Sequence, residues 1–93
     1  MRSAERAMIR EMHITSIGVQ VRPEHLTRVA AAIDELEGAE VHARSSEGKL
    51  VIVLETESDA QVMDRLGAIR DLDGVLAAHL VFHRILDDAA LGG

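Results

Sequence analysis

The sequence predicts an α+β fold in which six elements follow the order β-α-β-β-α-β. Apolar residues take every second position in a segment typical of a strand, and every third or fourth position in two segments typical of helices. The spacing of Ile33, Leu36 and Gly38 recurs 36 residues later, at the end of the second helical segment. The chain is therefore expected to consist of two strand-helix-strand units.

The first unit starts with a strand over His13–Val21, in which apolar residues alternate from Ile17 onward. Pro23 ends this strand and suits the first turn of a helix, because the N–H that proline lacks has no partner there. The helix is expected over Glu24–Leu36, with its apolar residues on one stripe. Gly38 then suits the left-handed conformation that commonly ends a helix.

A hairpin is expected next, with strands over Ala39–Arg44 and Lys49–Thr56. The residues between them, 45–48, are typical of a four-residue turn, so the two strands should run antiparallel. The second of these strands is apolar on both faces, which is typical of a strand in the centre of a sheet.

The last two elements are a helix and a strand. Ser58 is a good N-cap for a helix from Asp59 to about Asp71. Gly74 ends that connection and precedes a fourth strand over Val75–His83.

Two right-handed crossovers of this kind predict a ferredoxin-like fold, a split β-α-β domain. We expect a four-stranded antiparallel sheet of order 4-1-3-2 with both helices on one face. Residues 13–86 should form this single domain, between a flexible N-terminal extension, 1–12, and a flexible C-terminal tail, 87–93. The fold supports many functions, so it names none by itself.

The composition excludes several classes of function. No cysteine is present, which excludes disulfides and thiolate metal sites. The net charge of −6 opposes general nucleic-acid binding and favours a cationic partner. The longest apolar run, Leu50–Leu54, is too short to span a membrane, and no secretory signal is recognised, so we expect a cytoplasmic protein.

No grouping of side chains indicates an enzyme, a metal site or a cofactor. His79 and His83 are expected on one face of one strand, roughly 13 Å apart, too far to share an ion. The serines lack a G-x-S-x-G context, and no glycine-rich phosphate loop occurs. An RNA-recognition module of this fold would need aromatic residues on strands one and three, and an acylphosphatase-like enzyme would need an asparagine; both are missing.

Because two helices cover only one side of such a sheet, the other side should be open. The covered side is assigned Ile17, Val19, Val21, Val41, Leu50, Ile52, Leu54, Leu76, Leu80 and Phe82. The open side also takes His42 and Arg44. The residues there that we expect to bind a peptide are Ser16, Gly18, Gln20, Val51, Val53, Glu55, Ala77, His79, Val81 and His83. Small residues between valines should form a shallow trough for an amphipathic helix.

Two other uses of this fold stay open at this point. Two copies could pack their open faces together as a homodimer. Alternatively, the chain could be a regulatory module resembling ACT domains, which bind small ligands such as amino acids as homodimers. The loop after the first strand, Arg22-Pro23-Glu24, lacks the glycine often found in ACT domains, which counts against that alternative.

The segment Gly74–His83 resembles the G-V-L-A-x-x-L-V-Y/F-H ending of the NapD family. Gly48–Glu55 is similar to the G-x-L-I-V-V-x-E segment of that family, and Ser16–Gln20 and Gly38–Val41 also fit. The resemblance covers roughly residues 13–83. The segment before Met12 is longer than the short leader that is usual in the family.

The resemblance implies a cytoplasmic chaperone for the maturation of periplasmic nitrate reductase. Such a chaperone binds the twin-arginine signal peptide of the catalytic subunit, NapA, and delays Tat export until the molybdenum cofactor is inserted. It is not an enzyme and carries no cofactor. Glu55 is the candidate partner for a signal-peptide arginine, and Glu40 is the second candidate.

Overall fold

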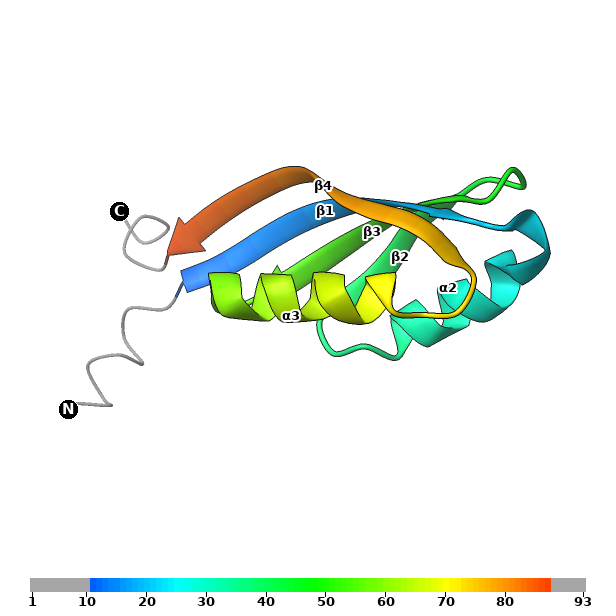
Figure 1. The fold of residues 1–93 in the computed structure, drawn as a ribbon. Helices are drawn as coiled ribbons and strands as arrows, with labels where there is room; N and C mark the ends of the chain where they lie inside the picture. Colours follow the sequence, from blue (N-terminus) through cyan, green and yellow to red (C-terminus); the bar gives the residue numbers. More distant parts are fainter. Residues whose placement is uncertain (1–10, 88–93) are drawn as a thin grey trace.

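The computed structural model describes residues 11–87. In chain order its elements are β1 (Glu11–Val21), the short 3-10 helix η1 (Pro23–His25), α2 (Leu26–Asp34), β2 (Ala39–Arg44), β3 (Lys49–Thr56), α3 (Asp59–Arg70) and β4 (Val75–Asp87) (Figure 1). The predicted order β-α-β-β-α-β is confirmed. The extension and tail predicted to be flexible fall mostly in residues 1–10 and 88–93, which lie outside the described residues.

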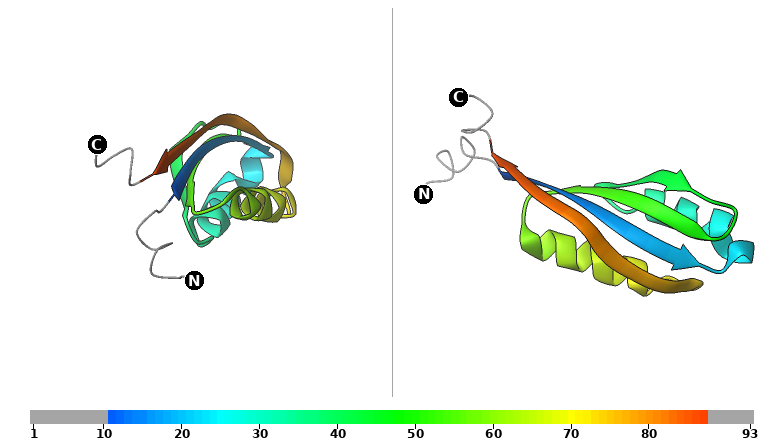
Figure 2. Two further views of the ribbon diagram at one scale, coloured as in Figure 1. Left: turned by 90° about the vertical axis from the view of Figure 1, so that its left-hand side faces the viewer. Right: turned by 90° about the horizontal axis from the view of Figure 1, so that it is seen from above.

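The four strands form one antiparallel sheet in the order β2-β3-β1-β4. This is the predicted order 4-1-3-2, counted from the other edge. Helices α2 and α3 lie side by side against one face of the sheet, and none of the described helices covers the other face (Figure 2). The prediction of a ferredoxin-like fold is therefore confirmed.

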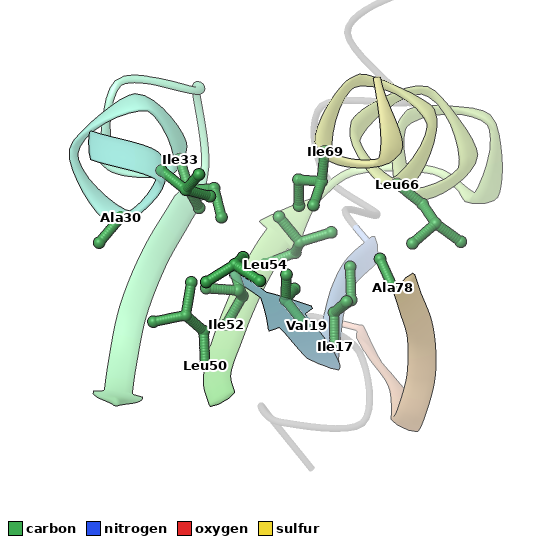
Figure 3. Packing of buried hydrophobic residues seen from close by; sticks show 12 residues of the cluster. Ile17, Val19, Ala30, Ile33, Leu50, Ile52, Leu54, Leu66, Ile69 and Ala78 are labelled. Atoms are coloured by element: carbon green, nitrogen blue, oxygen red, sulfur yellow. The ribbon is translucent and has the colours of Figure 1, made fainter. Parts of the chain in front are cut away.

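The core fills the space between the sheet and the two helices (Figure 3). Alternate residues of β1 and β3 meet one apolar stripe from each helix there. The members of this cluster are Ile17, Val19, Val21, Val29, Ala30, Ile33, Leu50, Ile52, Leu54, Leu66, Ile69 and Ala78. The predicted inward residues of β1 and β3 are thus confirmed.

The ends of the helices follow the sequence signals. The Ser58 side chain accepts a hydrogen bond from the Gln61 N–H at 3.2 Å, which confirms it as the N-cap of α3. Gly38 has the predicted left-handed backbone, with φ +81°. The predicted helix over Glu24–Leu36 is shorter at both ends, because it opens as η1 and closes with tight turns, including Leu36 N–H to Ile33 C=O at 2.9 Å.

Strand β4 is less regular than predicted. Ser16 pairs with Phe82, but the next residue, Ile17, pairs with Leu80, so Val81 is an extra residue on β4 at this point. A second shift of the same kind occurs near the start of the strand. β4 also extends to Asp87, beyond the predicted end.

An extra residue reverses the face on which each later side chain lies. Leu76, Leu80 and Phe82 were predicted to be core residues facing the helices, but they are 57%, 44% and 51% exposed. Leu80 lies on the helix side as predicted, because it pairs with the buried Ile17, whereas Phe82 lies on the opposite side and Leu76 is the extra residue at the second shift. His83, predicted on the open side, pairs with the buried Thr15 and lies on the helix side.

Candidate functional site

The side of the sheet that carries no described helix, called the open face here, is the candidate site (Figure 2). Residues that pair directly across antiparallel strands lie on the same face of the sheet. The pairing therefore identifies the residues of the open face and arranges them in rows across the strands. They are Ile14, Ser16, Gly18, Gln20, Glu40, Ala43, Lys49, Val51, Val53, Glu55, Ala77, His79, Phe82 and Arg84. Val81, the extra residue of β4, joins them because it lies over Gly18.

The central row crosses all four strands. Ser16 of β1 lies between Val53 of β3 and Phe82 of β4, and Glu40 of β2 pairs with Val53 on its far side. Phe82 is 51% exposed, so an aromatic ring and a valine flank a small polar residue. A single exposed apolar side chain is ordinary, but several that adjoin one another can mark a binding site.

The neighbouring row is built around Gly18, which lies between Val51 and His79. A Cβ atom at Gly18 would stand 3.1 Å from His79 Nε2 and 3.3 Å from Val81 Cγ2, so these side chains already lean over the glycine. Val51 and Val81 are 40% and 65% exposed. Val51 and Val81 therefore give the centre of the open face an apolar strip beside Gly18, at the position where the sequence predicts a trough, and this strip is called the trough below.

One end of the open face is acidic. Glu40 and Glu55 line one hollow of about 220 Å³ together with Gly38, Ala39 and Val53. The left-handed Gly38 brings the chain close to β3, where its C=O accepts from the Glu55 N–H at 2.8 Å. A hollow of this size is smaller than the ~300–1,000 Å³ of small-molecule sites. It suits one charged side chain.

The opposite margin is basic. Ile14 pairs with Glu55 on one side and with Arg84 of β4 on the other, so a carboxylate and a guanidinium flank one apolar residue. The open face therefore has an apolar centre, an acidic corner where Glu40 and Glu55 meet, and basic residues at Arg84 of β4 and at Lys49, at the other end of β3. A charged, elongated ligand should bind in one direction on such a face.

The structure brings most of the predicted binding residues together on this face, and it corrects two predicted open-side placements. Arg44 pairs with the buried Leu50 and so lies on the helix side. His83 lies beside His13 and Asp59 on the other side, with its Nε2 atom 3.2 Å from His13 Nδ1. Sequence reasoning missed Ile14 and Phe82. Phe82 is the only Phe, Tyr or Trp of the chain, but period-two alternation could not place it because the extra residue changes the register.

A family model described as "NapD protein" matches residues 12–87 of this chain. The chain belongs to the NapD family. Chaperone NapD of Paracoccus pantotrophus is 40% identical over 77 residues, covering 83% of this chain and 68% of its own length. Chaperone NapD of Escherichia coli K12 is 28% identical over 72 residues, covering 76% of this chain and 83% of its own length. The resemblance seen in the sequence is confirmed.

A solved structure agrees with this assignment. The solution structure of the E. coli Tat proofreading chaperone protein NapD superposes with a TM-score of 0.74 at 27% identity, over 78% of each chain. The NapD relatives carry the name of a chaperone and not of an enzyme, so this member of the family is a chaperone too. Within residues 11–87, no helix has the length and apolar character needed to cross a membrane.

Proposed function

We propose that the open face binds the twin-arginine signal peptide of the nitrate reductase catalytic subunit, NapA, in the cytoplasm. Binding there would delay Tat export until the molybdenum cofactor is inserted. The E. coli relative is called a Tat proofreading chaperone, and this name supports a client with such a signal. A twin-arginine signal combines a cationic start with a following apolar stretch.

One observation carries the proposal: the charge and the apolar character of the open face are complementary to those of such a peptide. Its acidic hollow, lined by Glu40 and Glu55, lies beside an apolar trough walled by Val51 and Val81. The arginines would lie at the hollow and the apolar stretch would lie across the trough. The proposed peptide-binding residues are those predicted from the sequence, except that His83 is removed and Phe82 and Glu40 are added. They are Ser16, Gly18, Gln20, Glu40, Val51, Val53, Glu55, Ala77, His79, Val81 and Phe82.

Apolar burial should supply most of the affinity. Fully burying a side chain of the size of Val or Phe contributes about 1.5–3 kcal/mol, and Val81 and Phe82 still expose half or more of theirs. An exposed ion pair contributes only about 0–1 kcal/mol, more where the peptide excludes water. Glu40 and Glu55 should therefore set the direction of the peptide and the association rate.

Calorimetric titration with the synthetic NapA leader tests this function. One leader should bind per chain, and a leader with both arginines replaced by glutamine should bind several-fold more weakly. The difference should shrink at high salt, because salt screens exposed charges. Absence of binding by the leader with its arginines intact would overturn the proposal. A chain that self-associates through its open face, as in the homodimer alternative, would show a leader affinity that falls with protein concentration.

A further inference from the structure

A second group of side chains meets on the opposite side of the sheet from the peptide trough. His13 of β1, Asp59 at the start of α3 and His83 of β4 each offer one ligand atom, all within 4.8 Å of one another. In Figure 1 the start of α3 lies beneath the beginning of β1, beside the far end of β4. Three elements that are distant in sequence therefore place metal-ligating groups at one point.

The three distances form a closed triangle. His13 Nδ1 lies 3.2 Å from His83 Nε2 and 3.3 Å from Asp59 Oδ1, and the His83 and Asp59 atoms are 3.7 Å apart. In a tetrahedral zinc site with bonds of about 2.0–2.1 Å, ligand atoms stand about 3.3–3.4 Å apart. Octahedral sites with the same bond lengths need only about 2.8–3.0 Å between neighbouring ligands. The triangle thus has the size of a tetrahedral face.

We propose that His13, Asp59 and His83 bind a divalent transition-metal ion of the Zn²⁺ class. Two imidazole nitrogens and one carboxylate oxygen are a ligand set that zinc accepts, with a fourth position left for water or a client group. The Asp59 side chain is 79% exposed, so that fourth position can be reached from solvent.

The ligands are held before any ion arrives. The His13 side chain is 3% exposed and that of His83 is 29% exposed, with the two rings at 90° to each other. His83 Nδ1 lies 3.4 Å from Thr15 Oγ1, a contact that can fix the ring and leave Nε2 free to ligate. Such supporting contacts are typical of histidine ligands.

The irregular register of β4 creates this grouping. Without the extra residue Val81, His83 would lie on the open face, as simple alternation predicts. With it, His83 pairs with Thr15 and faces the start of α3, where the Ser58 cap fixes the first turn that carries Asp59. A bound ion would join the far end of β4 to β1 and α3.

Zinc titration of tag-free protein tests the proposal, by calorimetry and by the visible absorption of Co²⁺ as a tetrahedral probe. The chain should bind one ion, and its melting temperature should rise with zinc concentration. His83→Gln and Asp59→Asn should each weaken binding by at least about tenfold. His42→Gln, an exposed histidine on β2, is the matched control and should leave binding unchanged.

His13 is not used as the first test, because its burial makes loss of folding an alternative cause of lost binding. Three results would overturn the proposal: no zinc binding, equal binding by wild type, His83→Gln and Asp59→Asn, or half an ion per chain, which indicates bridging between two copies. With either of the first two results, His13, Asp59 and His83 would form a hydrogen-bonded group only. Leader binding is measured separately and does not depend on the outcome.

Discussion

Ser16 and Phe82 are direct partners across β1 and β4, and this pair places the single aromatic side chain of the Phe, Tyr and Trp class on the open face. In a core built from aliphatic residues, an aromatic ring that is 51% exposed contributes little to folding. The ring is instead available to a ligand. Interface energetics commonly depend on such aromatic residues.

Phe82→Ala should therefore weaken leader binding by about tenfold while changing the free energy of unfolding by less than about 1 kcal/mol. The contrast follows from the half-exposed position of the ring. Calorimetry and urea unfolding measure the two quantities. Met63→Ala on α3, which is 57% exposed on the helix side, is the control and should leave leader affinity unchanged. A large loss of stability with unaltered leader affinity would show that Phe82 has a structural role.

Val53→Glu and Val81→Glu should each abolish leader binding, because each places a charge in the apolar trough. Val81 is 65% exposed, so its change should leave the fold intact. Val53 is partly buried, so its change should also cost some stability. Circular dichroism checks the fold and calorimetry the binding. Unchanged affinity in both variants would exclude the trough as the binding site.

Glu55→Gln and Glu40→Gln should lower leader affinity by up to about fivefold each and reduce its salt dependence. The two carboxylates line one hollow, so the double variant should lose most of the preference for arginine over glutamine leaders. Association rates at two salt concentrations are the measurement. Glu47→Gln, in the exposed β2–β3 turn, is the control, and an equal effect there would point to net charge alone.

Ser58→Ala should lower the free energy of unfolding by about 1 kcal/mol, because it removes the cap hydrogen bond to the Gln61 N–H. The exposed turn residue Ser46 gives the comparison, and Ser46→Ala should change stability by less than about 0.5 kcal/mol. Urea denaturation measures both. Ser58→Ala should also weaken zinc binding at the proposed site, since Asp59 follows the cap directly.

Much of this structure could be predicted because the local signals agree with the fold. The alternation from Ile17 along β1, the Ser58 cap and the left-handed Gly38 all take the predicted forms. Each depends on nearby residues only, and period-two alternation fixes a face wherever a strand is regular.

The parts that were missed depend on contacts between distant residues. Val81 is an extra residue opposite β1, which no pattern within β4 reveals, and so the faces of Phe82 and His83 were assigned wrongly. The approach of His13 to His83, 70 residues apart, follows from that same register. Histidine spacing along one strand therefore gave no sign of the cluster.

The most direct test of the proposed binding site is a map of which surface responds to the leader, from amide NMR shifts of the labelled chain. We predict that the changes concentrate at the outward residues of β1, β3 and β4 and at the hollow beside Glu55. In Val81→Glu the same leader should cause none of them. Changes confined to α2 and α3, or persisting in Val81→Glu, would contradict the claim that the open face is where this chaperone binds its client.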